Sequence, residues 1–281
     1  MNEIALRLED VTVLYGDYEV VSNSSISFPA GQVSLIIGKA GSGKSTLLKA
    51  AAGLVVPERG RVLIAGNDLA RMSHTENLAF RKTSAFVFQD SALWANQSIY
   101  NNLNLPLAVH EPGLPKSQAD ARIKEVVRRV GYNEGLAFRP AELSSGEQKL
   151  ISFARALVLD PSLIFLDEPD ASLDEEAVER VLEILKECKQ SGKTIIIVSH
   201  NTRLIAELAD FICVVADGKV VSCGPADQVA QVLGGELLKR IRSVRERDAA
   251  KLVADAAAGP AIDPAVDAAI DAAIDAASGG A

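Results

Sequence analysis

The second half of the chain alternates short apolar runs with longer segments whose apolar residues recur at helical spacing. Consecutive apolar or β-branched residues predict buried strands at 163–166 and 194–198. Helical spacing predicts helices at 175–190 and 202–208. Strands that alternate with helices in this way favour an α/β fold, in which a mostly parallel sheet carries helices on both faces.

The first ninety residues predict further strands. Strands are expected at 4–8 and 24–28, joined through a turn region at Tyr15–Gly16–Asp17. A buried type of strand at 32–37 runs into a glycine-rich loop, and a helix follows at 44–53. Additional strands are predicted at 61–64 and 85–88 and, as a hairpin near the end of the pattern, at 211–216 and 220–223.

The segment from residue 89 to about residue 140 interrupts this pattern. Strand signals vanish, Asn and Pro appear, and residues 117–130 have helical spacing. Another helix is predicted at 147–158. We therefore expect a helical subdomain, at about residues 90–158, inserted in a unit that spans residues 1–235. Residues 236–281 are expected to form a separate C-terminal extension.

Composition narrows the classes of function. The chain of 281 residues has a net charge of −8, but five of its 37 acidic residues follow Lys251, which leaves 32 acidic and 29 basic residues before that point. Because the positive and negative charges of residues 1–251 nearly cancel, the composition argues against a nucleic-acid-binding surface. Three scattered cysteines are expected to be reduced core thiols. No signal peptide is recognised, and no apolar run approaches the roughly 20 residues of a membrane span, so work at a membrane would require docking onto a partner.

Residues Gly38–Thr46 read GKAGSGKST, which matches the phosphate-binding pattern G-x-x-x-x-G-K-S. Glycines let backbone N–H groups of such a loop point inward at an anion. Lys44 would add positive charge at the β- and γ-phosphates, and the Ser45 hydroxyl is suited to Mg²⁺. The predicted strand before the loop and the predicted helix after it are the context that this pattern requires.

Two adjacent carboxylates, Asp167 and Glu168, end the apolar strand at 163–166. One carboxylate can hold a metal through its water shell, and the next can orient and deprotonate an attacking water. A pair of strand-end carboxylates can also serve only as helix caps. The phosphate loop upstream favours the catalytic interpretation.

A third pattern, LSSGEQKLISFARAL, lies between these two at Leu143–Leu157. Ser144 and Gly146 precede a helix whose N-terminus carries partial positive charge and is therefore suited to a γ-phosphate. Together the three patterns resemble the ABC (ATP-binding cassette) superfamily, whose signature commonly reads L-S-G-G-Q. Ser145 and Glu147 depart from that form, and the Ser145 change bears on local backbone geometry and so on turnover.

The resemblance covers residues 4 to about 231 and implies an ABC-type P-loop NTPase that hydrolyses ATP. The implied architecture has a RecA-like, mostly parallel sheet, a small N-terminal antiparallel β part, an inserted helical subdomain and a C-terminal helical extension. Gln89 resembles the glutamine that touches Mg²⁺ and senses the transporter, and His200 resembles the histidine that contacts the γ-phosphate. Tyr15 is favoured over Tyr18 for stacking on adenine.

The resemblance implies three sets of site residues. Residues expected to bind ATP are Tyr15, Gly38, Gly41, Ser42, Gly43, Lys44, Ser45, Thr46, Ser144, Gly146 and Asp174. Residues expected to act in catalysis are Lys44, Gln89, Glu168 and His200, and those expected at Mg²⁺ are Ser45, Gln89 and Asp167.

The resemblance also implies partners. A signature serves the nucleotide of the opposite subunit, so two copies would sandwich two ATP molecules head to tail. Membrane permease subunits would hold the dimer at the cytoplasmic face of the inner membrane. The segment Phe86–Leu107 resembles ATPases of Mla/Mce-type lipid transport systems. Uptake of amino acids or other small solutes, and a division-type ATPase without a transported solute, remain alternatives.

The C-terminal extension has two interpretations. Residues 237–251 predict a basic helix, and an Ala/Asp-rich tail with a four-residue period follows. A solvated helix with a disordered tail explains this composition. Alternatively, the extension reaches a neighbouring ATPase subunit or a small regulatory subunit.

Overall fold

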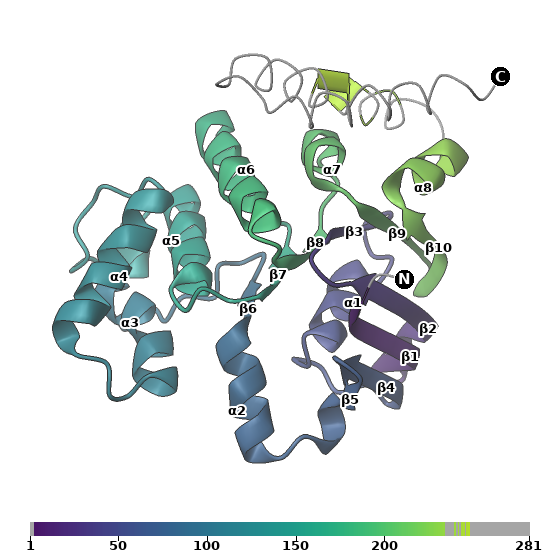
Figure 1. Cartoon of the computed structure of the whole chain (residues 1–281), viewed down its shortest axis with the longest axis horizontal. Coiled ribbons are helices and arrows are strands. Elements are labelled where there is room, and N and C mark those ends of the chain that lie inside the picture. Colours follow the sequence, from purple (N-terminus) through teal and green to yellow (C-terminus); the bar gives the residue numbers. More distant parts are fainter. Residues whose placement is uncertain (1–2, 234–238, 240, 242, 245, 248–281) are drawn as a thin grey trace, which may run out of the picture.

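A six-stranded sheet forms the centre of the molecule (Figure 1). The computed structural model describes residues 3–233 and, beyond them, residues 239, 241, 243, 244, 246 and 247. The sheet has the order β10-β9-β3-β8-β7-β6, in which β10 alone runs antiparallel to its neighbour. Its strands are β3 (Val33–Ile37), β6 (Ser84–Val87), β7 (Leu163–Asp167), β8 (Thr194–Val198), β9 (Phe211–Ala216) and β10 (Lys219–Pro225). The mostly parallel α/β fold expected from the sequence is thereby confirmed.

A second, antiparallel sheet is built from the N-terminal residues in the order β2-β1-β4-β5. Its strands are β1 (Ile4–Tyr15), β2 (Tyr18–Pro29), β4 (Arg59–Ile64) and β5 (Asn67–Asp68). The first two strands are much longer than the sequence pattern predicted. Asp10 and Asn23 adopt positive φ angles beside shifts in the register, so bulges carry the strands through polar residues that would otherwise end them.

The helices fall into two groups (Figure 1). Around the sheets lie α1 (Lys44–Ala51), α2 (His74–Thr83), α6 (Glu175–Gln190), α7 (Thr202–Leu208) and α8 (Ala226–Leu233), with the short 3₁₀ turn η1 (Leu69–Arg71). At one side, α3 (Ile99–His110), α4 (Lys116–Arg129), η2 (Pro140–Glu142) and α5 (Ser145–Leu157) form a helical subdomain. No strand interrupts residues 90–158, as the sequence pattern predicted, but α2 and α3 were not predicted.

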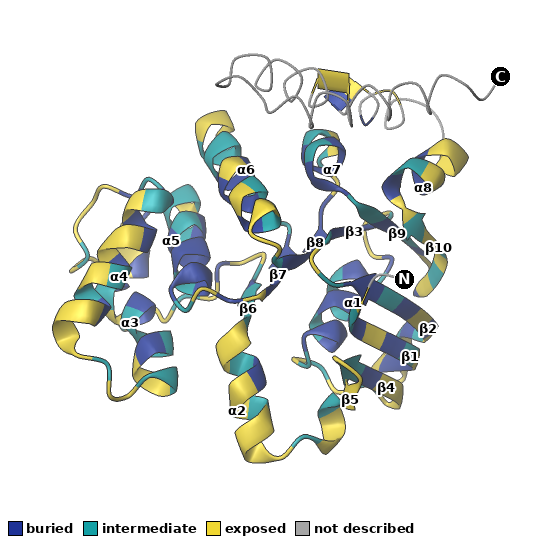
Figure 2. Ribbon diagram, viewed as in Figure 1, coloured by how far each residue is buried: buried dark blue, intermediate teal, exposed yellow. Residues whose placement is uncertain are grey.

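Successive side chains of the central strands point to opposite faces of the sheet, so the apolar core forms two clusters, one on each face. Leu35 belongs to the cluster beneath the helices α3–α8, whereas Ile36 belongs to the cluster beneath α1 and the N-terminal sheet. Ile195 and Ile196 divide in the same way. Figure 2 shows β7 and β8 as buried ribbon between flanking helices. Both faces of the sheet are therefore covered, which explains the continuous apolar runs of its strands.

Two described residues of the C-terminal extension contribute to this core. Ile241 and Val244 are buried and belong to the cluster beneath the helices. The rest of the predicted helix at 237–251, apart from the exposed residues 239, 243, 246 and 247, and the Ala/Asp-rich tail lie outside the described residues. Among the helices that the structure describes, none is long and apolar enough to cross a membrane.

Candidate active site

Four neighbouring parallel strands deliver the predicted site residues to one edge of the sheet. The glycine-rich loop follows β3, and His200 follows β8. Asp167 and Glu168 stand at the end of β7, and Gln89 follows β6. Since β3, β8, β7 and β6 are consecutive in the sheet and parallel, their carboxyl ends share an edge, where ligands of open α/β sheets bind.

Backbone from two strands presses against the glycine-rich loop. A Cβ atom on Gly38 would lie 2.1 Å from the carbonyl oxygen of Val215 in β9. A Cβ atom on Gly43, whose φ is 94°, would lie 2.6 Å from the carbonyl oxygen of Val20 in β2. A side chain at either position would displace backbone, so glycine is required for the loop to close into this shape.

The loop offers donors that fit an anion. Gly43 is the N-cap of α1 and provides no side-chain acceptor for the first N–H groups of that helix. The Ser42 hydroxyl is buried and has no hydrogen-bond partner among the described residues. The Lys44 ammonium folds back to donate a 2.7 Å hydrogen bond to the carbonyl oxygen of Lys39. A helix N-terminus, an unpaired hydroxyl and an ammonium group together are suited to a phosphate group.

A hydrogen bond joins the phosphate-binding segment to β7, the strand that ends in Asp167. The Ser45 hydroxyl donates a hydrogen bond of 2.7 Å to Oδ1 of Asp167, and the Lys49 ammonium lies 4.0 Å from Oδ2. Asp167 is almost completely buried, at 1 % exposure. In the part of the chain that the structure describes, no group of three or more His, Cys, Asp and Glu side chains could hold a metal. One hydroxyl and one carboxylate nevertheless fit Mg²⁺, which keeps several waters and takes its remaining ligands from phosphates.

Glu168 lies between the two other predicted polar residues. Its Oε2 accepts a 3.0 Å hydrogen bond from the side-chain amide of Gln89, and its Oε1 is 3.7 Å from Nδ1 of His200. Glu168 also has a φ of 47°, while its N–H donates to the carbonyl oxygen of Val198 at 2.9 Å. A left-handed conformation at a residue other than glycine is strained, and the surrounding bonds hold the carboxylate in this position.

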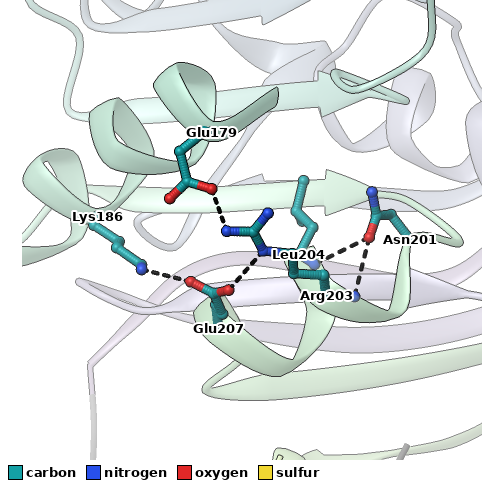
Figure 3. Close-up of polar contacts among 6 residues, drawn as sticks. All are labelled: Glu179, Lys186, Asn201, Arg203, Leu204 and Glu207. Carbon is teal, nitrogen blue, oxygen red and sulfur yellow. Dashed lines mark hydrogen bonds and ion pairs between the residues drawn. The ribbon is translucent and has the colours of Figure 1, made fainter. Parts of the chain in front are cut away.

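The loop that carries His200 is held by residues that the sequence analysis did not single out. Asp170 accepts hydrogen bonds from the Ser199 hydroxyl at 3.2 Å and from the Asn201 amide at 3.1 Å. Asn201 also caps α7 (Figure 3), because its Oδ1 accepts from the N–H groups of Arg203 and Leu204. The Pro-Asp pair directly after Glu168 was the available signal for Asp170.

Helix α7 is in turn fixed to α6 by a charged cluster (Figure 3). The Arg203 guanidinium donates to Glu179 of α6 and, at 3.0 Å, to Glu207 of its own helix. Lys186 of α6 reaches the other oxygen of Glu207 at 2.5 Å. This network ties α6 to α7, the helix that begins two residues after His200.

The signature segment forms the start of α5, within the helical subdomain. Ser144 is its N-cap, and a reciprocal capping box joins Ser144 to Glu147. Hydrogen bonds from Ser144 lower the pKa of the Glu147 carboxyl. Gly146 approaches the loop after β7, since a Cβ atom there would lie 3.3 Å from the carbonyl oxygen of Ser172. Asp174 ends that loop as the N-cap of α6, accepting from the N–H of Ala177 at 2.8 Å.

The remaining predicted residues lie in the phosphate loop, in α1 and at the β1–β2 turn. Gly41 has a φ of 76° with open space beside it, and Thr46 lies in the first turn of α1. Tyr15 and Tyr18 face each other as partners where the β1–β2 hairpin turns. Both rings are exposed, at 55 % and 73 %, so the choice between them as the adenine contact stays a prediction.

Sequence comparison defines the class of protein. The ABC transporter family matches residues 21–171, which is more than half of the chain. The chain belongs to this family, whose ATP-binding subunits hydrolyse ATP, and the ABC-type ATPase expected from the three patterns is confirmed.

Individual relatives come from different transport systems. The chain is 32 % identical over 232 residues to the intermembrane phospholipid transport system ATP-binding protein MlaF of Haemophilus influenzae, which covers 82 % of this chain and 88 % of MlaF. It is 34 % identical over 212 residues to the methionine import ATP-binding protein MetN of Carboxydothermus hydrogenoformans, covering 75 % of this chain and 62 % of MetN. These relatives do not share one substrate.

Solved structures agree with the fold. The dimeric ATP-binding cassette MJ0796, bound to ADP and Pi in a post-hydrolysis state, superposes with a TM-score of 0.73 and 28 % sequence identity. The match covers 79 % of this chain and 98 % of that one. The chain is therefore an ABC ATPase with the α/β architecture expected from the sequence.

Proposed function

We propose that this chain binds Mg²⁺-ATP at the edge formed by β3, β8, β7 and β6, with Glu168 as the general base for hydrolysis. The observation that carries the proposal is the placement of the Glu168 carboxylate between Gln89 and His200, at 3.0 and 3.7 Å. A carboxylate held in this way can accept a proton from an attacking water. His200 would contact the γ-phosphate and orient the same region.

The phosphate loop and Asp167 would hold the nucleotide and its metal. Lys44 and the N–H groups at the start of α1 would neutralise phosphate charge, and the unpaired Ser42 hydroxyl would donate to a phosphate oxygen. Ser45, Asp167 and Gln89 supply oxygens suited to Mg²⁺. When bound, this metal would neutralise charge that develops on the phosphate oxygens.

A second copy of the chain would complete the site. Ser144 and Gly146 form a helix N-terminus that can bind an anion, yet they belong to the helical subdomain and follow none of the strands that carry the phosphate loop, Glu168 and His200. A head-to-tail dimer would bring this N-terminus, and Asp174 from the adjoining loop, to the γ-phosphate of the opposite copy. The dimeric form of the cassette MJ0796 supports this assembly.

Membrane subunits would dock beside the loop that carries Gln89. A groove there runs along β6, α3 and α5, and its apolar lining includes Phe86, Phe88, Leu105, Pro106, Val109 and Leu159. A permease at this groove would sit next to the active site and hold the ATPase at the cytoplasmic face of the inner membrane. No nucleic-acid partner is proposed, because the body of the chain is nearly balanced in charge.

We propose lipids, and phospholipids in particular, as the transported class. The similarity to MlaF over 88 % of its length supports this assignment, as does the likeness of segment Phe86–Leu107 to lipid-system ATPases. Import of an amino acid is the second candidate, because MetN is 34 % identical to this chain. A small regulatory subunit that binds the C-terminal extension belongs to the lipid proposal.

One purification tests the assembly and the substrate together. The chain would be isolated from membranes of its own host with a mild detergent, and the co-purified proteins and lipids identified by mass spectrometry. Enrichment of a permease with phospholipid supports the lipid assignment. A permease that co-purifies with an amino-acid-binding protein, and without lipid enrichment, would favour the second candidate. The Lys44→Ala variant should retain the permease, since docking does not require the nucleotide contact.

A further inference from the structure

The loop that carries Gln89 is fastened to α5 through its main-chain oxygens. The ammonium of Lys149 donates to the carbonyl oxygens of Phe88 at 2.8 Å and of Gln89 at 2.6 Å. Six residues further along α5, the Arg155 guanidinium donates to the carbonyl oxygens of Ala92 at 2.9 Å and Ser91 at 3.2 Å. Two basic side chains of one helix thus hold both ends of residues 88–92.

Lys149 is an unusual residue to find at such a place. Its side chain is 1 % exposed, although lysine is rarely fully buried without a partner. Among the described residues, the two carbonyl oxygens are the hydrogen-bond partners of its Nζ. Burial lowers the pKa of Lys149, and the more distant carboxylates of Asp167 and Asp90 act in the opposite direction.

The held segment has a strained backbone. Ser91 and Ala92 have φ values of 64° and 45°, in the left-handed region that residues with a Cβ atom disfavour. These are the two residues whose carbonyl oxygens Arg155 binds. The contacts from α5 therefore stabilise a strained loop rather than a relaxed one.

A continuous path of contacts leads from α5 to the proposed general base. Lys149 binds the main chain of Gln89, and the side-chain amide of Gln89 binds the Glu168 carboxylate. The same helix begins at Ser144, which is proposed to meet the nucleotide of the opposite copy. A shift of α5 on docking would consequently move the backbone of Gln89 with it.

We propose that Lys149 is a positioning residue that ties the signature helix of one subunit to Gln89 in that subunit's own active site. Through this tie, docking of α5 onto the nucleotide of the opposite copy is transmitted to Glu168. Arg155 holds the far end of the same loop. This inference rests on the proposed roles of Gln89, Glu168 and the dimer.

The first test measures the loop directly, in the full-length chain without nucleotide. Hydrogen–deuterium exchange of peptides that cover residues 86–96 would be compared for the parent, Lys149→Met and Arg155→Met. Methionine keeps a long unbranched side chain but cannot donate to the carbonyl oxygens. We expect faster exchange in these peptides and unchanged exchange in β7 and β8. Lys124→Met, at an exposed position of α4, is the matched control and should behave as the parent.

The second test measures the consequence for hydrolysis. Lys149→Met should lower kcat by roughly tenfold to a hundredfold, as expected when a catalytic group is misplaced by about 1 Å, with little change in the KM for ATP. Combining it with Gln89→Ala should cause little further loss, because both changes act on one step. Lys149→Arg, which keeps a cation and several donors, should recover part of the activity.

The exchange and turnover measurements can each overturn the inference. Parent-like exchange in residues 86–96 of the Lys149→Met variant would overturn the inference, as would independent losses in the double variant. If Lys149→Met does not fold, the same two measurements on Arg155→Met decide. Parent-like turnover in Gln89→Ala would instead contradict the proposed role of Gln89, and with it this inference. Impaired Gln89→Ala together with parent-like Lys149→Met would overturn the inference alone.

Discussion

The side-chain amide of Gln89 donates a 3.0 Å hydrogen bond to the carboxylate of Glu168, although 79 residues separate them in the chain. The pairing of parallel strands β6 and β7 makes this contact possible, because it brings the ends of both strands together. An amide on one oxygen and His200 near the other define the direction in which the carboxylate can accept a proton. The effect of replacing Glu168 depends on this arrangement.

Replacement of the proposed base should separate nucleotide binding from hydrolysis. Glu168→Gln keeps the size of the side chain and its contact with Gln89 but removes the proton acceptor. We expect the ATPase rate to fall by about 10²–10⁴, while ATP-dependent dimerisation, followed by size-exclusion chromatography, persists or increases. Glu183→Gln, at an exposed position of α6, is the control and should hydrolyse ATP as the parent does. Parent-like turnover in Glu168→Gln would remove Glu168 from its proposed role.

The unpaired hydroxyl of Ser42 should lower the stability of the free protein and raise its affinity for ATP. An unsatisfied buried hydroxyl is unfavourable, so Ser42→Ala should leave the melting temperature of the free protein unchanged or raise it. The same change should weaken ATP binding by about 1.5–3 kcal/mol, the value of a hydrogen bond to a charged group. Thermal unfolding and calorimetric titration with a non-hydrolysable ATP analogue measure the two effects.

Ser152→Ala provides the matched comparison for this prediction. The Ser152 hydroxyl is also buried and also has no partner among the described residues, but it belongs to α5 and not to the phosphate loop. It should resemble Ser42→Ala in thermal unfolding and the parent in nucleotide binding. Equal nucleotide affinities of the two serine variants would show that Ser42 does not donate to a phosphate.

The paired tyrosines at the β1–β2 turn allow a direct choice between two adenine contacts. Tyr15→Ala should weaken binding of the ATP analogue by roughly 1–3 kcal/mol, the range for a base stacked on an aromatic ring. Tyr18→Ala should bind as the parent does, and it is a close control because both rings are exposed partners on the same hairpin. The reverse result would transfer the role to Tyr18.

Periodicity in the sequence predicted the elements whose stability comes from burial on a regular face. Helix α6 and strand β8 have the bounds that the pattern indicated, because each presents a continuous apolar face to the core. Helix α3 was missed because Pro106 and several Asn residues interrupt its pattern. Helix α2 has little apolar character, although the capping box of Ser73 and Glu76 was a visible signal for its start.

The site residues also differ in whether the sequence could reveal them. Residues in local patterns, such as Lys44, Ser45 and the pair at the end of β7, were recognisable because their chemistry depends on neighbours in the chain. Lys149 was not, since its role depends on which main-chain oxygens lie opposite it, 60 residues earlier in the sequence. Asp170 likewise acts on a loop about 30 residues away. Sequence spacing alone carries no information on such contacts.

The boundary at residue 235 can be tested through the buried side chains that follow it. Ile241 has 1 % exposure and belongs to the core cluster beneath the helices α3–α8. Ile241→Ala should therefore lower the free energy of unfolding by about 2–5 kcal/mol. Val232→Ala, at a position with 80 % exposure in α8, should change it by less than about 0.5 kcal/mol. Urea unfolding of both variants measures the difference.

Truncation after Gly235 extends the same argument to the whole extension. The proposed catalytic set ends at His200, so the shortened chain should fold and bind ATP, with a lower melting temperature because the burial of Ile241 and Val244 is lost. Co-purification with the membrane subunits then tests whether the extension also serves assembly. A truncated chain that does not fold would place residues 236–247 inside the ATPase domain. Parent-like unfolding of both the truncated chain and Ile241→Ala would show that these side chains do not stabilise the core.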